Sequence, residues 1–129
     1  MLPPYEPYIP RSSGEINDKL AWMVLHSPRF EDDTGFFPGQ NLETTFFSLN
    51  EGFKAIRNRL GTERYAALLA LSDRARAHFE ADPEENNGGA GAGCALLNDM
   101  TDILRSLHRR KPVAANDTGE PASVPPRNA

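Results

Sequence analysis

Cysteine, long apolar runs and excess positive charge are all scarce in this chain of 129 residues. The single cysteine, Cys94, excludes an intramolecular disulfide and a zinc site built from several thiolates, and it is typical of a reducing compartment. No stretch reaches the roughly 20 apolar residues that cross a bilayer, and residues 1–10 lack the apolar segment of a secretory signal. The sequence therefore predicts a cytoplasmic protein without a membrane segment.

Positive charge is outweighed by negative charge. The chain holds 14 Lys and Arg against 18 Asp and Glu, which gives a formal net charge of -4. Duplex nucleic-acid binders rely on Lys and Arg to neutralise phosphates, so this balance argues against that class. The length fits one domain. Because Pro 11 and Gly 10 exceed what helices normally hold, part of the chain is expected to be irregular.

The clearest element is a helix from Leu42 to Gly61. Its apolar residues recur at steps of four and three, which places them on one side of a helix. Asn41 is suited to cap its N-terminus, and Gly61 supplies a left-handed stop. The expected seam consists of Leu42, Phe46, Leu49, Phe53, Ile56 and Leu60.

Three further helices are expected from the same kind of pattern. Ser12 is a candidate N-cap, with capping-box spacing, for a helix over 13–26. Thr62 can cap a helix that follows the seam helix directly, and a connection this tight predicts an antiparallel hairpin. A last helix is expected over 94–110, where apolar residues again keep helical spacing.

The segments around these helices are rich in proline, glycine or acidic residues. Four prolines predict an extended arm over 1–12, and residues 27–40 are expected to form a long loop. The glycine-rich run over 86–93 is expected to be a flexible connection, because glycine loses much backbone entropy in a helix. Residues 112–129 have the composition of a disordered tail. The helical domain is thus placed at 13–111.

Together these elements predict an all-α fold. The architecture would be a small, mainly antiparallel four-helix bundle with an extended N-terminal arm and a disordered C-terminal tail. Each helix would bury one apolar stripe against the others. The expected core consists of Leu20, Met23, Phe46, Leu49, Phe53, Ile56, Leu60, Tyr65, Leu68, Phe79, Leu97, Met100, Ile103 and Leu104.

The sequence indicates no catalytic, metal or cofactor site. The glycine run lacks the Gly-Lys-Ser/Thr ending of a phosphate loop. Cys94 could act as a nucleophile beside a histidine, but no histidine stands in a catalytic motif, and a lone cysteine at a helix start is more often a packing residue. The histidines are far apart, and Phe30 breaks the calcium-loop pattern at its first ligand position. We therefore expect no enzyme, no cofactor and no metal.

Charge and aromatic residues suggest a binding surface. The loops are acidic and the second and third helices are basic, and acidic loops can steer a protein onto a basic cleft; plain solvation of the loops is the alternative. Adjacent phenylalanines cannot all face one core, so one of each pair either lies at a surface or is covered by the long loop. The candidate partner-binding residues are Glu31, Asp32, Asp33, Phe36, Phe37, Phe47, Glu84 and Glu85.

Short motifs in residues 15–85 carry a resemblance. The helix over 15–25 is followed by Phe37-Pro38-Gly39, by Ala55-Ile56-Arg57 in the seam helix, and by Ala77 to Glu84. Together they resemble a small all-helical bacterial immunity family that neutralises type VI secretion effectors acting on nucleotides or NAD. The resemblance implies a protein that occludes the active site of a toxin and performs no catalysis. This chain departs from the pattern in the insertion at 27–36.

The expected function is a non-catalytic protein-binding module of the immunity or antitoxin type, which occludes a toxin partner with a basic cleft. The alternative is a self-associating structural or regulatory helical protein, including an accessory protein of the phage type, which would form a homodimer. An enzyme centred on Cys94 has the least support. Neither a nucleic acid nor a membrane is expected as a partner.

Overall fold

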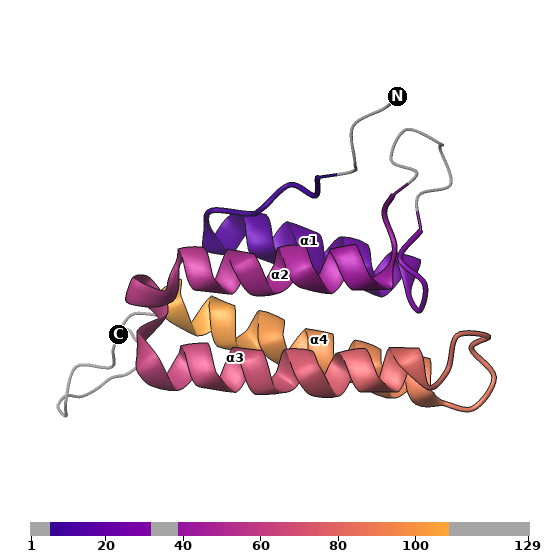
Figure 1. Ribbon diagram of the computed structural model, residues 1–129. Helices are drawn as coiled ribbons and strands as arrows, with labels where there is room; N and C mark the ends of the chain where they lie inside the picture. The colour runs from indigo at the N-terminus through magenta and orange to yellow at the C-terminus, as the bar shows by residue number, and fades with distance from the viewer. Residues whose placement is uncertain (1–5, 32–38, 109–129) are drawn as a thin grey trace, which may run out of the picture.

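The computed structural model describes residues 6–31 and 39–108 of the chain (Figure 1). These residues form the helices α1 (Ser13–His26), α2 (Leu42–Ala55), α3 (Arg57–Glu80) and α4 (Gly89–Arg105), followed by the short 3-10 helix η1 (Ser106–His108). No strand occurs in this part of the chain, so the all-α prediction is confirmed. The tail predicted over 112–129 lies outside the described residues.

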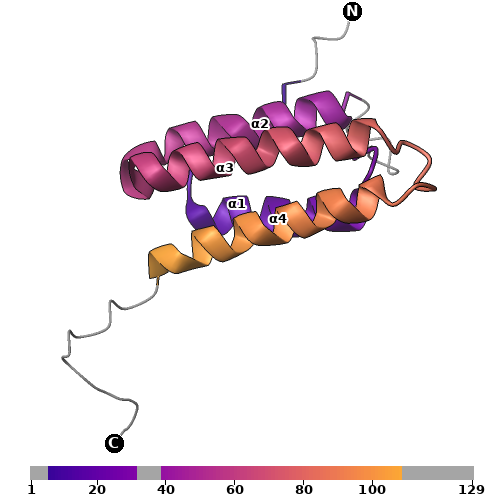
Figure 2. The same cartoon turned by 90° about the horizontal axis from the view of Figure 1, so that it is seen from below.

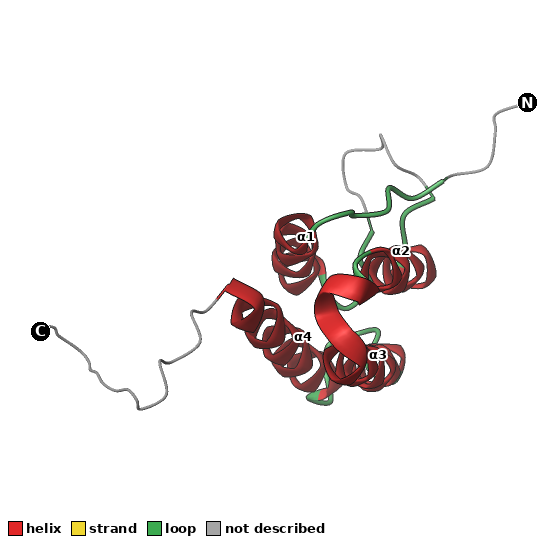
Figure 3. Cartoon of the chain, turned by 90° about the vertical axis from the view of Figure 1, so that its left-hand side faces the viewer, coloured by secondary structure: helices red, strands yellow, loops and turns green. Residues whose placement is uncertain are grey.

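The four helices form an antiparallel bundle around one core. Viewed end-on, each helix occupies one corner and packs on the next along the chain, and α1 also packs on α4 (Figure 3). We call the end that carries residues 27–31, 39–41 and 81–88 the loop end. The opposite end, with the α2–α3 connection and the start of α1, is called the hairpin end (Figures 1 and 2).

Side-chain caps fix the starts of α1 and α2, as the sequence predicts. The Ser12 hydroxyl accepts a hydrogen bond from the Glu15 amide at 3.1 Å. Asn41 and Thr44 form a reciprocal capping box, in which each side chain accepts from the backbone amide of the other at 2.9 and 3.0 Å. Such caps satisfy amides that have no partner inside the helix.

The seam helix is shorter than predicted, because α2 ends at Ala55 instead of reaching Gly61. Ile56 leaves the helical conformation at φ -111° and ψ 18°. Its carbonyl then accepts from the amides of Arg59 and Leu60, at 2.9 and 3.0 Å, which starts a new turn. Gly61 interrupts α3 after that turn with φ 82° and ψ 165°. Its positive φ agrees with the prediction, but it does not end the seam helix as predicted. The break reorients the chain while Ile56 and Leu60 both remain buried.

The flexible connection predicted over 86–93 is wrong for its second half, since α4 begins at Gly89 and not at Cys94. Tertiary packing explains this outcome. A Cβ atom on Gly93 would lie only 2.6 Å from the Phe79 ring, so glycine lets α3 and α4 approach closely. Burial of the Phe79 ring offsets the entropic cost of a helical glycine. At its other end α4 stops at Arg105, earlier than the predicted residue 110.

Most of the predicted core is buried. Tyr65 and Ile103 are exceptions, because they are only partly buried at its edge. The buried apolar residues outside the list of expected core residues are Ile16, Phe30, Ala75, Ala90 and Leu96.

Phe30 is the least expected of these residues, since it belongs to a loop. Its backbone adopts φ 58°, which is unfavourable for a bulky residue, yet its side chain is 0% exposed. The Phe30 ring meets Phe79 edge-on at a centroid distance of 5.0 Å and Phe46 at 5.7 Å. Aromatic burial and edge-to-face contact compensate for the backbone conformation.

Two glycines of α4 provide a matched test of the α3–α4 contact. Gly93→Ala should lower the free energy of unfolding by about 1 to 3 kcal/mol, because its methyl group would overlap the Phe79 ring. Gly91→Ala, where no atom lies within 4 Å of the added Cβ, should instead raise it by about 0.5 to 1 kcal/mol. Urea denaturation measures both. Equal effects of the two substitutions would contradict the packing argument.

Candidate functional site

The predicted partner-binding residues are only partly within the described chain. Asp32, Asp33, Phe36 and Phe37 lie outside it. The other four are exposed: Glu31, Phe47, Glu84 and Glu85.

A side-chain bridge joins the two acidic loops at the loop end. Arg29, next to Glu31 in sequence, donates from Nη2 to Glu84 Oε2 at 2.8 Å and from Nε to the Pro83 carbonyl at 3.2 Å. These segments are more than fifty residues apart in the chain. The structure therefore places Glu31, Glu84 and Glu85 at the same end of the bundle (Figure 1).

The buried carboxylate of Asp82 organises the second acidic loop. Asp82 is 1% exposed, and it accepts from the backbone amides of Asn86, Asn87 and Ala90 at 2.8, 3.2 and 2.8 Å. The bond from Ala90, helped by those from Asn86 and Asn87, holds the pKa of the Asp82 carboxyl below its usual value. Asp82 thus caps the first turn of α4 from across the loop.

Phe47 is an exposed aromatic side chain on α2. It lies one turn after Glu43 on α2 and is 53% exposed, whereas Phe46 is 0% exposed. This pair therefore divides between surface and core, as predicted. Another large apolar side chain, Leu25 of α1, is exposed by 80%.

Charge is separated along the bundle axis. At the loop end, Arg29 is paired with Glu84, and Arg76 is paired with Glu80, so the remaining exposed charges there are mainly carboxylates. At the hairpin end, exposed basic residues outnumber exposed acidic ones. The exposed basic residues there are Arg11, Lys54, Arg57, Arg59, Arg64 and Arg105.

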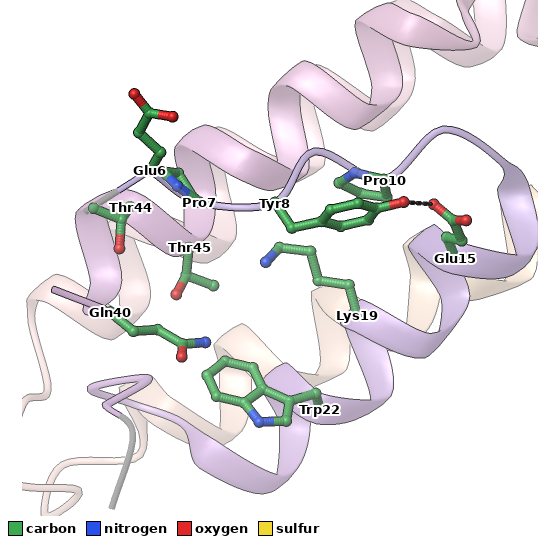
Figure 4. Close-up of a pocket in the computed structure, with 10 residues that line it drawn as sticks. All are labelled: Glu6, Pro7, Tyr8, Pro10, Glu15, Lys19, Trp22, Gln40, Thr44 and Thr45. Atoms are coloured by element: carbon green, nitrogen blue, oxygen red, sulfur yellow. Dashed lines mark hydrogen bonds between the residues drawn. The ribbon is translucent and has the colours of Figure 1, made fainter. Parts of the chain in front are cut away.

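The structure also contains a pocket of about 400 Å³ that the sequence did not predict, between α1, α2 and the N-terminal arm (Figure 4). We call it the arm pocket. It is lined by Glu6, Pro7, Tyr8, Pro10, Glu15, Lys19, Trp22, Gln40, Thr44 and Thr45.

The arm is fixed in place by specific contacts. The Ser48 hydroxyl of α2 donates to the Tyr8 carbonyl at 2.5 Å. Pro10 is buried against Gly52, where a Cβ would lie 2.8 Å from the proline ring. On the other side, the Tyr8 hydroxyl and the Arg11 amide both donate to Glu15 Oε1 at 2.9 Å. The described part of the predicted extended arm therefore forms one wall of the pocket.

Lys19 places its ammonium group in the arm pocket. Burial lowers the pKa of Lys19 to about 8. Glu15, one helical turn earlier, is the usual salt-bridge partner for such a lysine, but its carboxylate faces Tyr8 and Arg11 (Figure 4). The two ion pairs between described residues do not include Lys19. No described carboxylate therefore offsets the cost of burying this charge.

Thr45 adds a second polar group to the pocket. Its side chain is 1% exposed, and its Oγ1 has no hydrogen-bond partner among the described residues. Trp22 forms an apolar wall, and its ring stacks on His26 at a centroid distance of 4.3 Å. The His26 Nδ1 lies 2.9 Å from the Trp22 carbonyl, which fixes the pair further. The Lys19 stem runs beneath the Tyr8 ring, and Nζ points away from Glu15 (Figure 4).

The other groups that the sequence raised for chemistry remain apart. Cys94 Sγ lies 3.3 Å from Ser27 Oγ, and no hydrogen bond joins it to a histidine in the described chain. Within residues 6–31 and 39–108, no three His, Cys, Asp or Glu side chains gather closely enough to hold a metal ion. None of the helices described is both long and apolar enough to cross a membrane.

One sequence signal could have pointed to the arm pocket. Lys19 stands three residues after Ile16 and four before Met23, both of which are 0% exposed. Helical spacing therefore places Lys19 beside the buried stripe of α1. Its actual burial depends on the arm, whose path over α1 and α2 has no signature in the sequence.

Comparison of the chain with protein families, with curated proteins and with solved structures finds no match. The resemblance to an immunity family consequently stays a prediction from short motifs.

Replacement of Lys19 tests the cost of its buried charge. Lys19→Met should raise the free energy of unfolding at pH 7 by about 1 to 3 kcal/mol, because each unit of pKa shift is worth about 1.4 kcal/mol. Folded Lys19 loses its proton near pH 8, and the unfolded chain keeps it up to the ordinary pKa of 10.5. The wild type therefore gains stability from pH 8 to 10.5, and the advantage of the variant should shrink there. Urea titrations at pH 7 and at pH 10 measure this change in the free energy of unfolding.

The exposed Lys54 is the control for that experiment. Lys54→Met should change the free energy of unfolding by less than about 0.5 kcal/mol at either pH. If the two variants behaved alike, Lys19 would not carry an uncompensated buried charge.

Replacement of Asp82 tests the organisation of the second acidic loop. Asp82→Asn should lower the stability of the protein more than Glu84→Gln, which removes an exposed ion pair only. The folded pKa of Asp82 is lowered, so its contribution is present above the ordinary value of 3.8 and is lost as the pH falls further. Thermal unfolding from pH 7 to 2.5 should show the difference between Asp82→Asn and the wild type closing at acid pH. A constant difference would rule out the carboxylate as its cause.

Proposed function

We propose that this chain is a non-catalytic protein-binding module of the immunity or antitoxin type, which binds its partner at the loop end. The observation that carries the proposal is the bridge from Arg29 to Pro83 and Glu84, because it joins two acidic loops into one preorganised surface. Preorganisation reduces the entropy that binding would otherwise cost.

The chemistry of the loop end favours a partner with a basic cleft. Glu31 and Glu85 are exposed there and have no ion pair to another described residue. Clustered carboxylates accelerate association with a positive surface and discriminate against negative ones. Phe47 supplies an exposed aromatic ring on the neighbouring helix, and aromatic side chains are frequent anchors at protein interfaces.

The immunity type is favoured by the resemblance of residues 15–85 to an immunity family and by the charge of the loop end. An inhibitor of a nucleotide- or NAD-directed toxin needs no catalytic group of its own. It needs a rigid, negatively charged projection that can enter a cleft built to hold phosphate-bearing substrates. Glu31, Glu84 and Glu85 give the loop end negative charge, and the contacts of Arg29 tie its two loops together.

Self-association is a second candidate function, supported by the separation of charge along the axis. An acidic loop end and a basic hairpin end could meet between copies in a head-to-tail arrangement. Such contacts would weaken as ionic strength rises. Sedimentation at low and high salt distinguishes the two candidates, because an immunity protein needs no such assembly.

Coexpression with the products of the flanking genes tests the immunity proposal. One product is expected to arrest bacterial growth when expressed alone, and this chain should restore growth and bind that product. The double variant Glu31→Lys, Glu85→Lys should weaken binding at least about tenfold, mainly through slower association. Glu63→Lys with Asp99→Lys changes the net charge equally at exposed positions away from the loop end and should leave binding intact.

Apolar contact is tested in parallel. Phe47→Asp should weaken the complex, whereas Leu25→Asp, at an exposed apolar position on another helix, should not. If no flanking product is toxic or binds this chain, the immunity proposal is wrong. If binding occurs but survives the loop-end substitutions, the proposed surface is wrong.

A further inference from the structure

We propose that the arm pocket is a binding site for a small organic carboxylate with a flat apolar body. This inference goes beyond the protein-binding function, since it concerns a different surface and a free small molecule.

The first argument is the placement of Lys19. Lys19 is partly buried and forms no ion pair with a described carboxylate. A charge in this position destabilises the fold, and methionine could fill the same space without that cost. Perturbed and uncompensated charges of this kind cluster at functional sites, particularly where they face a cavity. The cavity here, about 400 Å³, falls within the range of ligand pockets.

The second argument is independent and rests on Thr45. Thr45 lines the same pocket, and its buried Oγ1 lacks a hydrogen-bond partner among the described residues. Buried hydroxyl groups normally have a partner, so an orphan one calls for an occupant of the pocket. A carboxylate is a suitable occupant because it accepts hydrogen bonds from both an ammonium group and a hydroxyl group.

The remaining walls define the body of the ligand. Trp22 and Tyr8 present aromatic surfaces to the cavity, and the stacking of His26 on Trp22 holds the indole ring in place. A flat apolar group can pack against such rings. Phosphate sites commonly use arginine forks or several backbone amides, and the lining of the arm pocket contains no arginine.

Two carboxylates line the pocket as well, but neither satisfies Lys19. Glu15 accepts from Tyr8 and Arg11, and Arg11 above all keeps the pKa of the Glu15 carboxyl below its usual value. Glu6 is exposed on the arm at the rim. The ligand carboxylate would enter on the side of Nζ that faces away from Glu15 (Figure 4).

Calorimetry with benzoate on the full chain tests the proposal, with Trp22, the only tryptophan, as a second probe by fluorescence. Benzoate should bind saturably with a Kd on the order of 1 mM or tighter, as suits so small a ligand. Benzamide, which has the same shape without the charge, should bind at least about tenfold more weakly, and inorganic phosphate should not compete.

Three variants assign the binding to the proposed groups. Lys19→Met should weaken benzoate binding at least about tenfold, and Thr45→Val, which removes the hydroxyl and keeps the shape, should weaken it about threefold to tenfold. Lys54→Met is the control and should bind benzoate like the wild type. Because Lys19→Met is expected to fold more stably than the wild type, a loss of binding in this variant cannot be attributed to unfolding.

The pH dependence of benzoate binding gives an independent readout. Affinity should fall between pH 7 and 9.5, because Lys19 loses its charge near pH 8. Glu15 and Tyr8 do not change charge in this range, because hydrogen bonds hold the pKa of the Glu15 carboxyl below its usual value and raise the pKa of Tyr8 above its ordinary 10.0.

The outcomes that overturn the proposal are specific. They are the absence of saturable binding, equal binding of benzamide, full competition by phosphate, and unchanged affinity in Lys19→Met. None of them bears on the loop end, so the protein-binding function can fail or succeed separately.

Discussion

The packing of the Phe79 ring is the constraint on which the bundle depends. Phe30 comes to this ring from the loop after α1, Phe46 from α2, and Gly93 from α4. Contacts with this one ring of α3 therefore involve α2, α4 and the segment that follows α1. Close packing of this kind tolerates no larger residue at Gly93, because an added methyl group would overlap the Phe79 ring. The close approach of α3 and α4 depends on this glycine and, nearer the loop end, on Gly89, where a Cβ would lie 2.8 Å from the His78 carbonyl oxygen.

The same packing determines what the loop end can present. Phe30 is drawn into the core at the expense of an unfavourable backbone conformation, and Arg29 and Glu31 on either side of it are thereby carried to the rim. Asp82 shapes the facing loop through its bonds to backbone amides. The ion pair between Arg29 and Glu84 then joins these two loops, which are remote in sequence, at one end of the bundle.

The sequence predicted what depends on local pattern. Stripes and caps predicted the four helices, the Asn41 cap and most of the core, because spacing and capping act within a few residues. It failed where distant residues decide. Gly93 belongs to α4 because it packs on Phe79 of α3, and Phe30 is buried because its ring packs against Phe46 and Phe79 of other helices. Of the candidate site, the exposure of Phe47 and Glu84 could be expected from pattern. The bridge by Arg29 and the pocket around Lys19 could not, because each requires two segments to meet in space.

Docking of the arm makes the pocket conditional on the arm. Tyr8 and Pro10 form one side of it only while Ser48 holds the Tyr8 carbonyl and Gly52 accommodates the proline ring. Binding of the proposed ligand and docking of the arm would then be linked, so that each would favour the other by the same factor. A partner that displaced residues 6–12 from α2, or a protease that cleaved them, would remove one wall of the pocket and leave Lys19 in place.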